Sequence, residues 1–122
     1  MKGFVAALIL AAVLLGGITG NYIYINRVAD RMNERLEKLP DVTNDACVTA
    51  VKELLEYWGA HADTVCLSVA FNTVDRVNEQ ATTLLACAEC GDVYGYQTAL
   101  ALLRDSIGDM RRLEAFSIGN LL

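Results

Sequence analysis

Proline, histidine and tryptophan are nearly missing from this chain of 122 residues, since each occurs only once, as Pro40, His61 and Trp58. With a single proline, the chain has few points at which a helix is forced to end. The alternation of apolar and polar residues that marks a half-buried strand is also nearly absent, whereas Ala, Leu, Glu and Arg are plentiful. These absences predict an all-α fold.

The motifs of common enzyme classes are missing as well. The sequence has no glycine-rich phosphate loop, no Ser/His/Asp set and no His-Glu-x-x-His. A lone histidine needs partners to act as a metal ligand or general base, and Asp63 and Cys66 stand at awkward helical spacings from His61. We therefore expect a protein that is not an enzyme, with no cofactor and no bound metal.

Positive charge is scarce over most of the chain. The first 40 residues hold five Lys/Arg and three Asp/Glu, a net of +2, whereas residues 41–122 hold five and twelve, a net of -7. An acidic domain without a basic face repels the phosphate backbone, so we expect no nucleic-acid partner. The same charge favours the solubility of this part of the chain.

What the chain does have is a long apolar run, from Gly3 to Asn26, without a charged residue. At about 1.5 Å of rise per residue, a helix of this length can cross roughly 30 Å of hydrocarbon. The start resembles a secretory signal, but Gly20 is a poor cleavage position because Ile18 stands two residues before it. We predict an uncleaved transmembrane anchor over residues 1–26.

The orientation of the anchor is indicated by two opposing features. The signal-like start favours a domain outside the cytoplasm, whereas the four Lys/Arg that follow the span favour the opposite orientation. We predict a single-pass protein of the cell membrane with an extracytoplasmic domain. Tyr22 and Tyr24 lie near the outer end of the span, where an aromatic belt is expected.

Small residues on the anchor suggest a further hypothesis. Ala12, Gly16 and Gly20 share one helix face, where they allow two anchors to approach closely and form a homodimer. The alternative is that small residues are simply common in such spans.

Residues 27–40 have apolar side chains at every third or fourth position, which is typical of an amphipathic helix. No helix breaker separates this segment from the anchor, so the pattern allows one long helix. Pro40 predicts its end, because the residue before a proline is pushed out of the α region. We divide the chain into the anchor, a juxtamembrane amphipathic helix over 27–40 and an acidic helical bundle over 41–122.

Glycine marks the expected helix ends within residues 41–122. We predict a second helix that stops at Gly59 and a third helical stretch with a kink or short break at Asn72-Thr73. Gly91 is expected in the left-handed conformation, with Asp92 as the N-cap of a last helix that packs antiparallel against the helix before it. The prediction is a transmembrane helix followed by a small antiparallel helical bundle.

Four cysteines are the remaining reactive groups. Cys87 and Cys90 form a CxxC that closes a helix instead of opening one, and no second CxxC accompanies it. Their Cα separation in a helix is about 5 Å, which permits a disulfide outside a cell. We predict at most this one disulfide, with free thiols at Cys47 and Cys66. The alternative is that the cysteines pack as small apolar residues.

Several stretches resemble a known family. They are "EYWGAH" at 56–61, "VDRVNE" at 74–79, "CGD" at 90–92 and the stretch 103–122, which ends in an "E-x-F-S-x-x-N-L-L" pattern. In these stretches the chain resembles the domain of unknown function 4363 family, small membrane-anchored helical proteins of spore-forming Clostridia and their relatives. The resemblance implies a helical domain that is tethered to the cell membrane and faces outward, with no established activity. Phe71 stands where the family pattern has a second histidine, which weakens any paired-histidine metal site.

We interpret the chain as a membrane-tethered, non-enzymatic interaction or scaffold component of the cell envelope, and the family's hosts connect it with sporulation. The alternative is an outward-facing module that senses a small molecule or a metal. An apolar groove on a solid core favours the first function, and a hollow polar pocket favours the second.

The residues expected to contact an unidentified protein partner are aromatic or apolar and lie in two stretches of the bundle: Tyr57, Trp58, His61, Phe116, Leu121 and Leu122. For Trp58 and His61 a structural role competes with this one. In that role they cap a corner between helices, Trp58 lies in the core, and a ring nitrogen of His61 bonds to the backbone.

Overall fold

The structure is a computed structural model that describes the backbone of residues 1–66, 69 and 71–121, and the side chains of these residues up to residue 112. Four helices make up the described part of the chain: α1 (Lys2–Glu37), α2 (Ala46–Cys66), α3 (Phe71–Cys90) and α4 (Val93–Leu121). The prediction of a long apolar first helix followed by a helical bundle is confirmed.

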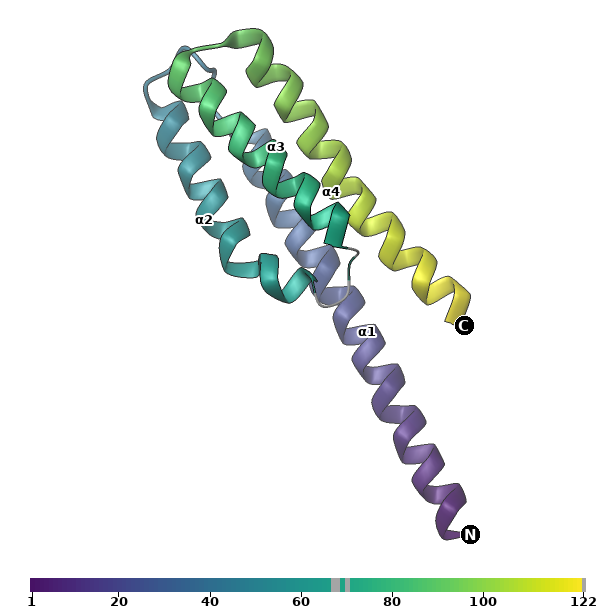
Figure 1. The fold of residues 1–122 in the computed structure, drawn as a ribbon. Coiled ribbons are helices and arrows are strands. Elements are labelled where there is room, and N and C mark those ends of the chain that lie inside the picture. The colour runs from purple at the N-terminus through teal and green to yellow at the C-terminus, as the bar shows by residue number, and fades with distance from the viewer. Residues whose placement is uncertain (67–68, 70, 122) are drawn as a thin grey trace.

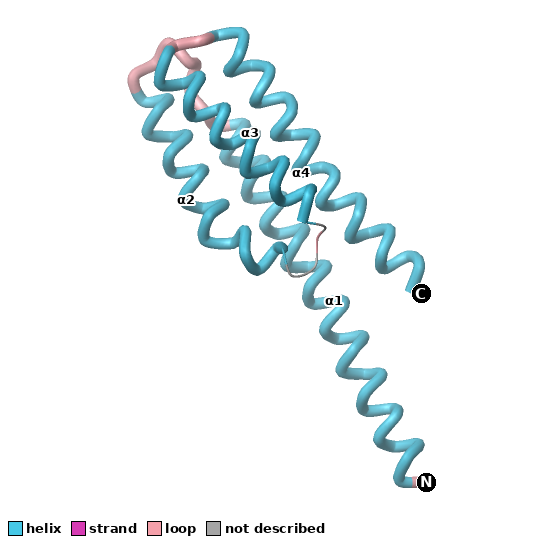
Figure 2. Tube along the Cα trace, in the orientation of Figure 1, coloured by secondary structure: helices cyan, strands magenta, loops and turns pink. Residues whose placement is uncertain are grey.

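Successive helices run in opposite directions and lie along one another (Figures 1 and 2). Each helix packs against two others, so that α1 contacts α2 and α4, and α3 contacts the same two helices from the other side. The prediction that the last helix packs antiparallel on the one before it is confirmed. The first half of α1 and the end of α4 both extend from the same end of the bundle (Figure 1).

The helix α1 passes from the apolar run into the bundle without interruption. All but two of its first 20 residues are exposed, whereas from Ile25 onward it buries one side chain at every turn. These buried residues are Ile25, Val28, Ala29, Met32 and Leu36. The amphipathic pattern over 27–40 therefore belongs to one of the four bundle helices. The helix ends at Glu37, shortly before Pro40, as the restriction on the residue before proline requires.

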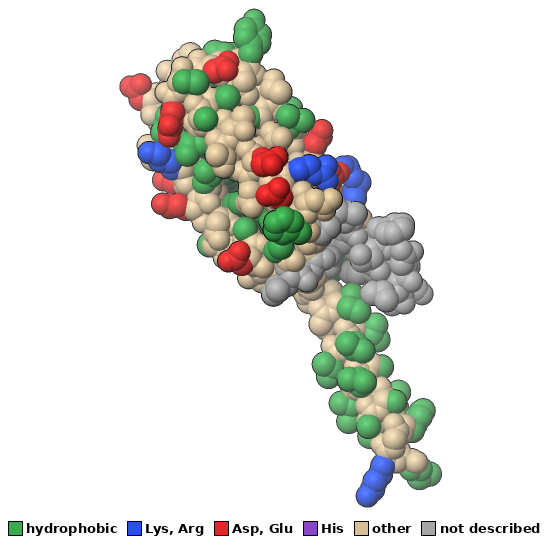
Figure 3. All heavy atoms as spheres, in the orientation of Figure 1, with side chains coloured by type: hydrophobic (Ala, Val, Ile, Leu, Met, Phe, Trp, Pro, Cys, Tyr) green, Lys and Arg blue, Asp and Glu red, His purple; other side chains and the backbone are tan. Residues whose placement is uncertain are grey.

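The surface of the molecule changes along the same axis. On the face that Figure 3 shows, apolar side chains lie along the projecting part of α1, and acidic side chains are scattered over the bundle. The described structure leaves the apolar half of α1 without a protein covering. None of the residues in its most apolar stretch of 18 residues is buried.

The core is filled by apolar side chains from all four helices. On α3 the buried positions recur with the helical period, since Val74, Val77, Ala81 and Leu84 all face the core. Each fully buried side chain of this size stabilises the bundle by roughly 1.5–3 kcal/mol relative to an exposed one. On α4 the buried apolar residues include Tyr96, Leu103, Ile107 and Met110, whose spacings of seven, four and three residues put them on one face of the helix.

The prediction that Gly59 ends a helix is wrong, because α2 continues to Cys66. Gly59 is exposed, and a Cβ at this position would meet no atom within 4 Å. Trp58 before it and Val65 after it are both buried, and their packing outweighs the roughly 1 kcal/mol by which glycine weakens a helix interior. The break expected at Asn72-Thr73 is also wrong, since both residues lie inside α3 and Thr73 is buried.

The turn between α3 and α4 follows local chemistry. Gly91 has a φ of 70°, as predicted, and Asp92 Oδ1 accepts a hydrogen bond from the Gly95 amide at 3.0 Å, which caps α4. A Cβ on Gly95 would lie 2.5 Å from Asp92 Oδ2 and 2.7 Å from Cys87 Sγ. Glycine at residue 91 therefore meets a conformational need of this turn, and a side chain at residue 95 would force the capping carboxylate of Asp92 and the thiol of Cys87 to shift.

Candidate functional site

Trp58 is a core residue, with only 3% of its surface exposed. Its indole N–H donates to Asn78 Oδ1 at 2.5 Å, a bond that joins α2 to α3 and satisfies the buried donor. The indole is therefore closed to a partner. Trp58 therefore has the structural role, in the core, and not the role of a partner-binding residue.

His61 lies between two tyrosines that come from different helices. The Tyr24 hydroxyl on α1 is 2.8 Å from His61 Nδ1. The Tyr57 ring, one turn before His61 on α2, has its centroid 4.6 Å from the imidazole centroid. The ring nitrogen thus bonds to a side chain, which corrects the expected bond to the backbone. When the neutral ring carries its proton on Nε2, Nδ1 accepts from the tyrosine hydroxyl.

Tyr24 was expected in an aromatic belt at the membrane surface. In the structure it also joins two helices of the bundle. The hydroxyl reaches across 37 residues of sequence to His61, and the two ring centroids lie 5.9 Å apart. The contact fixes α2 against α1 just where the buried part of α1 begins at Ile25.

Arginine side chains of α1 surround the same cluster. The guanidinium carbon of Arg35 lies 4.8 Å from the Tyr57 ring centroid, within the range of a cation–π contact. Burial raises the pKa of the Tyr57 hydroxyl, and the positive charges of Arg31 and Arg35 oppose that shift in part. The cluster is thus aromatic at its centre and positive at its edge.

A pocket of about 250 Å³ opens between α1 and α2 at this cluster. We call it the junction pocket, and its lining residues are Tyr24, Arg27, Val28, Arg31, Tyr57 and His61. The lining has two guanidinium groups, two phenol hydroxyls and an imidazole, and none of the six residues is acidic. Apart from the Tyr24 hydroxyl, which is engaged with His61 Nδ1, these groups can donate to an anion. A neighbouring hollow farther along α1 includes Glu34 in its lining and lacks the aromatic rings.

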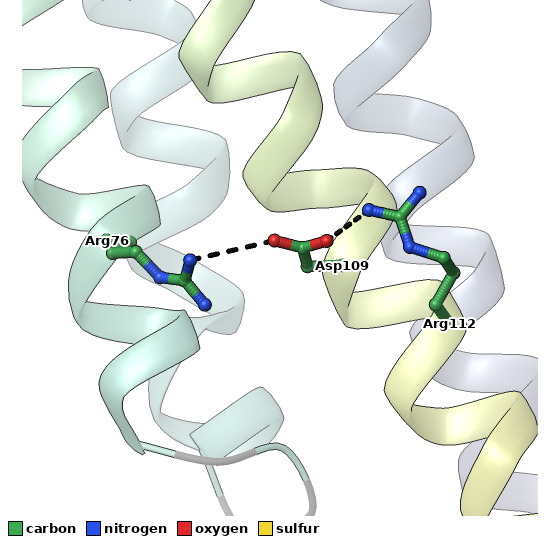
Figure 4. Close-up of polar contacts among 3 residues, drawn as sticks. All are labelled: Arg76, Asp109 and Arg112. Carbon is green, nitrogen blue, oxygen red and sulfur yellow. Dashed lines mark hydrogen bonds and ion pairs between the residues drawn. The ribbon is translucent and has the colours of Figure 1, made fainter.

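Ion pairs fasten α4 to the helices beside it. Arg111 of α4 pairs with Asp30 of α1. Figure 4 shows Asp109 of α4 between two arginines, with Arg76 of α3 at 3.7 Å and Arg112 one turn along α4 itself. These groups are substantially exposed, so each pair stabilises the fold by about 1 kcal/mol at most.

All four cysteines are free thiols in the structure, with Cys47 buried and Cys90 exposed. Burial raises the pKa of the Cys87 thiol, and the nearby Asp92 carboxylate raises it further. A raised pKa lowers the thiolate fraction, which argues against a reactive nucleophile at Cys87. The disulfide between Cys87 and Cys90 in an oxidising compartment stays a prediction. Among the described residues, no group of three or more His, Cys, Asp and Glu side chains could hold a metal ion.

The remaining predicted site residues lie at the two ends of the chain. Ala12, Gly16 and Gly20 are on the exposed half of α1, and a Cβ built on either glycine would meet no described atom within 4 Å. The homodimer through this face stays a prediction. The side chains of Phe116 and Leu121, and all of Leu122, lie outside the described residues, although the helical backbone of α4 runs to Leu121.

Four members of the junction pocket were missed in the sequence. Tyr24, Arg27 and Arg31 recur at a spacing of three and four residues, which puts them on one face of a helix. That spacing is a usable signal for a shared helix face, whereas the positive-inside rule relates the arginines only to the orientation of the anchor. The approach of Tyr57 and His61 to this face had no local signal, because it depends on how α2 packs on α1.

Comparison of the chain with protein-family models, with curated proteins and with solved structures finds no match. The resemblance to the domain of unknown function 4363 family stays a prediction. Arguments about function therefore rest on the geometry described above.

Proposed function

We propose that this chain is a membrane-tethered, non-enzymatic helical protein of the cell envelope, whose bundle contacts a protein partner. The observation that carries the proposal is the division of α1 into an uncovered apolar half and a half that forms part of the bundle core. In the described part of the chain, α1 is the one helix long and apolar enough to cross a membrane.

Exposed apolar side chains on the first half of α1 support the tether. Phe4, Leu8, Ile9 and Leu14 are each more than half exposed, and they lie all around the helix. Apolar surface left in water costs about 25 cal/mol per Å², and a bilayer removes this cost along the whole half-helix. A patch of this kind on a soluble protein would otherwise cause association.

The bundle itself supports an interaction role. Its core is filled, and several large apolar side chains remain on its surface, among them Phe71 and Tyr94, which are 72% and 88% exposed. Tyr94 stands at the start of α4, at the end of the bundle away from the projecting half of α1 (Figure 1). Exposed aromatic rings are frequent anchors of protein interfaces. We therefore assign the partner contact to Tyr94 instead of the buried Trp58.

The tether is tested on the natural protein in its own membranes. We expect the protein to resist extraction at alkaline pH and to retain Met1 or Lys2 as its N-terminus, as read by intact mass spectrometry. A mature protein that begins near Asn21 would be secreted, and the tether would be wrong.

The side of the membrane is tested with a thiol reagent that cannot cross it. Cys90 is exposed and Cys47 is buried, so they serve as target and internal control. On intact cells we expect labelling of Cys90, after reduction if it is bridged to Cys87, and weaker labelling in a Cys90→Ser variant, which keeps the half-buried thiols Cys66 and Cys87. Labelling that requires lysis would place the bundle in the cytoplasm.

The partner is tested by site-specific photocrosslinking in native membranes. A crosslinking residue at Tyr94 should give a discrete protein adduct, whereas the same residue at exposed Glu56 of α2 should give none. Absence of an adduct at Tyr94 and at Phe71 would contradict a contact through these rings.

A second function, the sensing of a small molecule, is favoured by one observation. The junction pocket has a mainly apolar wall that carries guanidinium, hydroxyl and imidazole groups, and it is held by contacts between two helices, as is common in ligand-binding modules.

A further inference from the structure

The junction pocket lies where the apolar half of α1 meets the bundle, and its lining is rich in donors for an anion. We propose that this pocket binds the phosphate group of an anionic phospholipid headgroup. The inference rests on the membrane tether of the proposed function, and it adds a ligand that neither the fold nor the tether requires.

The two arginines supply the charge. Arg27 and Arg31 stand four residues apart on α1, so they lie one above the other on one helix face. A guanidinium offers several N–H donors in a plane, an arrangement that matches two oxygens of one phosphate. The Tyr57 hydroxyl and the Nε2–H of the His61 imidazole add donors to the same space, whereas the Tyr24 hydroxyl already donates to His61 Nδ1.

The nearest carboxylates of α1 lie outside the pocket lining. Asp30, the acidic residue between the two arginines in sequence, is paired with Arg111 of α4. Glu34 lines the neighbouring hollow, which Arg31 also lines together with the cations Arg35 and Lys38. The pocket therefore keeps two positive charges that no lining residue neutralises.

The pocket walls are held in place before any ligand arrives. The hydrogen bond from Tyr24 to His61 joins the two helices, and the Tyr57 ring packs on the imidazole. Arg35, outside the pocket, lies over the Tyr57 ring. Donors that are already positioned lose less conformational entropy on binding, which favours affinity for a small anionic group.

The height of the pocket fits a headgroup. Ile23 is the last exposed apolar residue of the run, and Arg27 follows it by four residues, or about 6 Å along the helix axis. The polar layer of a bilayer is roughly 5–8 Å thick on each side of the hydrocarbon. Because helical side chains tilt toward the N-terminus, which is the membrane side here, Arg31 also reaches back into this layer.

The lipid, and not free phosphate, is the occupant that this position favours. A lipid phosphate is fixed at the level of Arg27, and its acyl chains can lie along the uncovered apolar half of α1. Free phosphate would meet the same donors without these added contacts, so it should bind more weakly.

The test uses the full chain in a mild detergent, with binding measured by native mass spectrometry during titration. The probes are phosphatidylglycerol, phosphatidylcholine and inorganic phosphate. We expect phosphatidylglycerol to bind most tightly, because the choline cation of phosphatidylcholine is repelled by the arginine pair. The double variant Arg27→Gln/Arg31→Gln should weaken phosphatidylglycerol binding by roughly tenfold or more.

The matched control removes the same charge elsewhere. Lys52→Gln/Arg104→Gln also loses two positive charges from exposed positions, one on α2 and one on α4, and should bind phosphatidylglycerol as the natural chain does. Arg27 and Arg31 are exposed, so circular dichroism should show an intact bundle in the test variant. Equal binding by the test variant, or an equal loss in the control, would overturn the assignment.

Two further outcomes separate the alternatives. If inorganic phosphate binds as tightly as phosphatidylglycerol and competes with it fully, the pocket takes free phosphate and the lipid assignment is wrong.

Because binding is measured in detergent, it does not depend on anchoring in the cell. A protein that is secreted but keeps its lipid binding counts against the tether alone, and an anchored protein with no lipid preference counts against the pocket alone.

Discussion

The two halves of α1 carry the same kinds of apolar side chain in opposite environments. Leu10 and Leu14 are 61% and 58% exposed, whereas Met32 and Leu36 are at most 2% exposed. The difference follows the pattern and not the residue type. Apolar residues surround the first half of the helix, but in the second half they occupy one face with charged residues between them. A one-faced pattern indicates packing on protein, and an all-round pattern indicates a different covering, for which we propose the bilayer.

The largest expected effect comes from placing a carboxylate in each half. Met32→Asp buries an unpaired charge and should cost about 5 kcal/mol or more, out of the roughly 5–15 kcal/mol that stabilise a small domain. We expect the cooperative thermal transition of the full chain in detergent, followed by circular dichroism, to disappear.

The matched change, Leu10→Asp, should leave that transition in place. It should instead reduce retention in membranes, since Asp near the centre of a span costs about 2.5–3.5 kcal/mol. If Leu10→Asp also abolished the melting transition, the first half of α1 would be covered by protein, and the contrast between the halves would be lost.

A smaller contrast comes from removing three carbon atoms from a leucine in each half. Leu36→Ala leaves a cavity in the core and should cost about 2–5 kcal/mol, measured by chemical denaturation. Leu14→Ala should leave the free energy of unfolding of the bundle unchanged within error. Equal losses at the two positions would mean that Leu14 packs against protein, and the contrast between the halves would be wrong.

Two helical glycines extend the comparison to the bundle. Gly95→Ala forces a methyl group against Asp92 and Cys87 and should destabilise the bundle by about 1–3 kcal/mol. Gly59→Ala meets open space in a helix interior and should stabilise it by roughly 0.5–1 kcal/mol. Thermal melts of the two variants should shift in opposite directions, and a loss of stability in Gly59→Ala would mean that α2 is broken at that residue after all.

The smallest expected effect lies at the boundary of the two halves. Asp30→Asn removes the pair with Arg111, and because Asp30 is largely exposed the loss should be about 0.2–1 kcal/mol. The difference from the natural chain should shrink as salt is added, since screening weakens exposed pairs. A loss that is large and independent of salt would indicate that the contact between α1 and α4 depends on this pair.

Local chemistry made part of the fold predictable. Gly91 and Asp92 mark the turn between α3 and α4. The backbone requires a left-handed residue after α3 and a hydrogen-bond acceptor for the free amides of α4, and both residue types can be recognised in the sequence. Pro40 acts in the same way near the end of α1. The failure at Gly59 has the opposite cause, since a weak local preference was overruled by the burial of Trp58 and Val65 on either side of it.

The junction pocket was out of reach of the sequence for a related reason. Its α1 side could be read from the spacing of Tyr24, Arg27 and Arg31, but its other wall comes from α2, whose rotation is set by the packed core. Contacts such as the one between Tyr24 and His61 join residues 37 positions apart, and no periodic pattern specifies them. The close fit of Gly95 likewise depends on the side chain of Cys87 on another helix.

The unbroken course of α1 has a mechanical consequence. The helix has 36 residues and a length of about 54 Å, with no loop or proline between its two halves. A swivel at the membrane surface would need such a break, so the bundle cannot turn independently of the apolar half. Any tilt or axial rotation imposed on that half is transmitted as torque to α2 and α4, which pack on the same helix. The orientation of Tyr94 at the far end is thereby tied to the orientation of the first turn of α1.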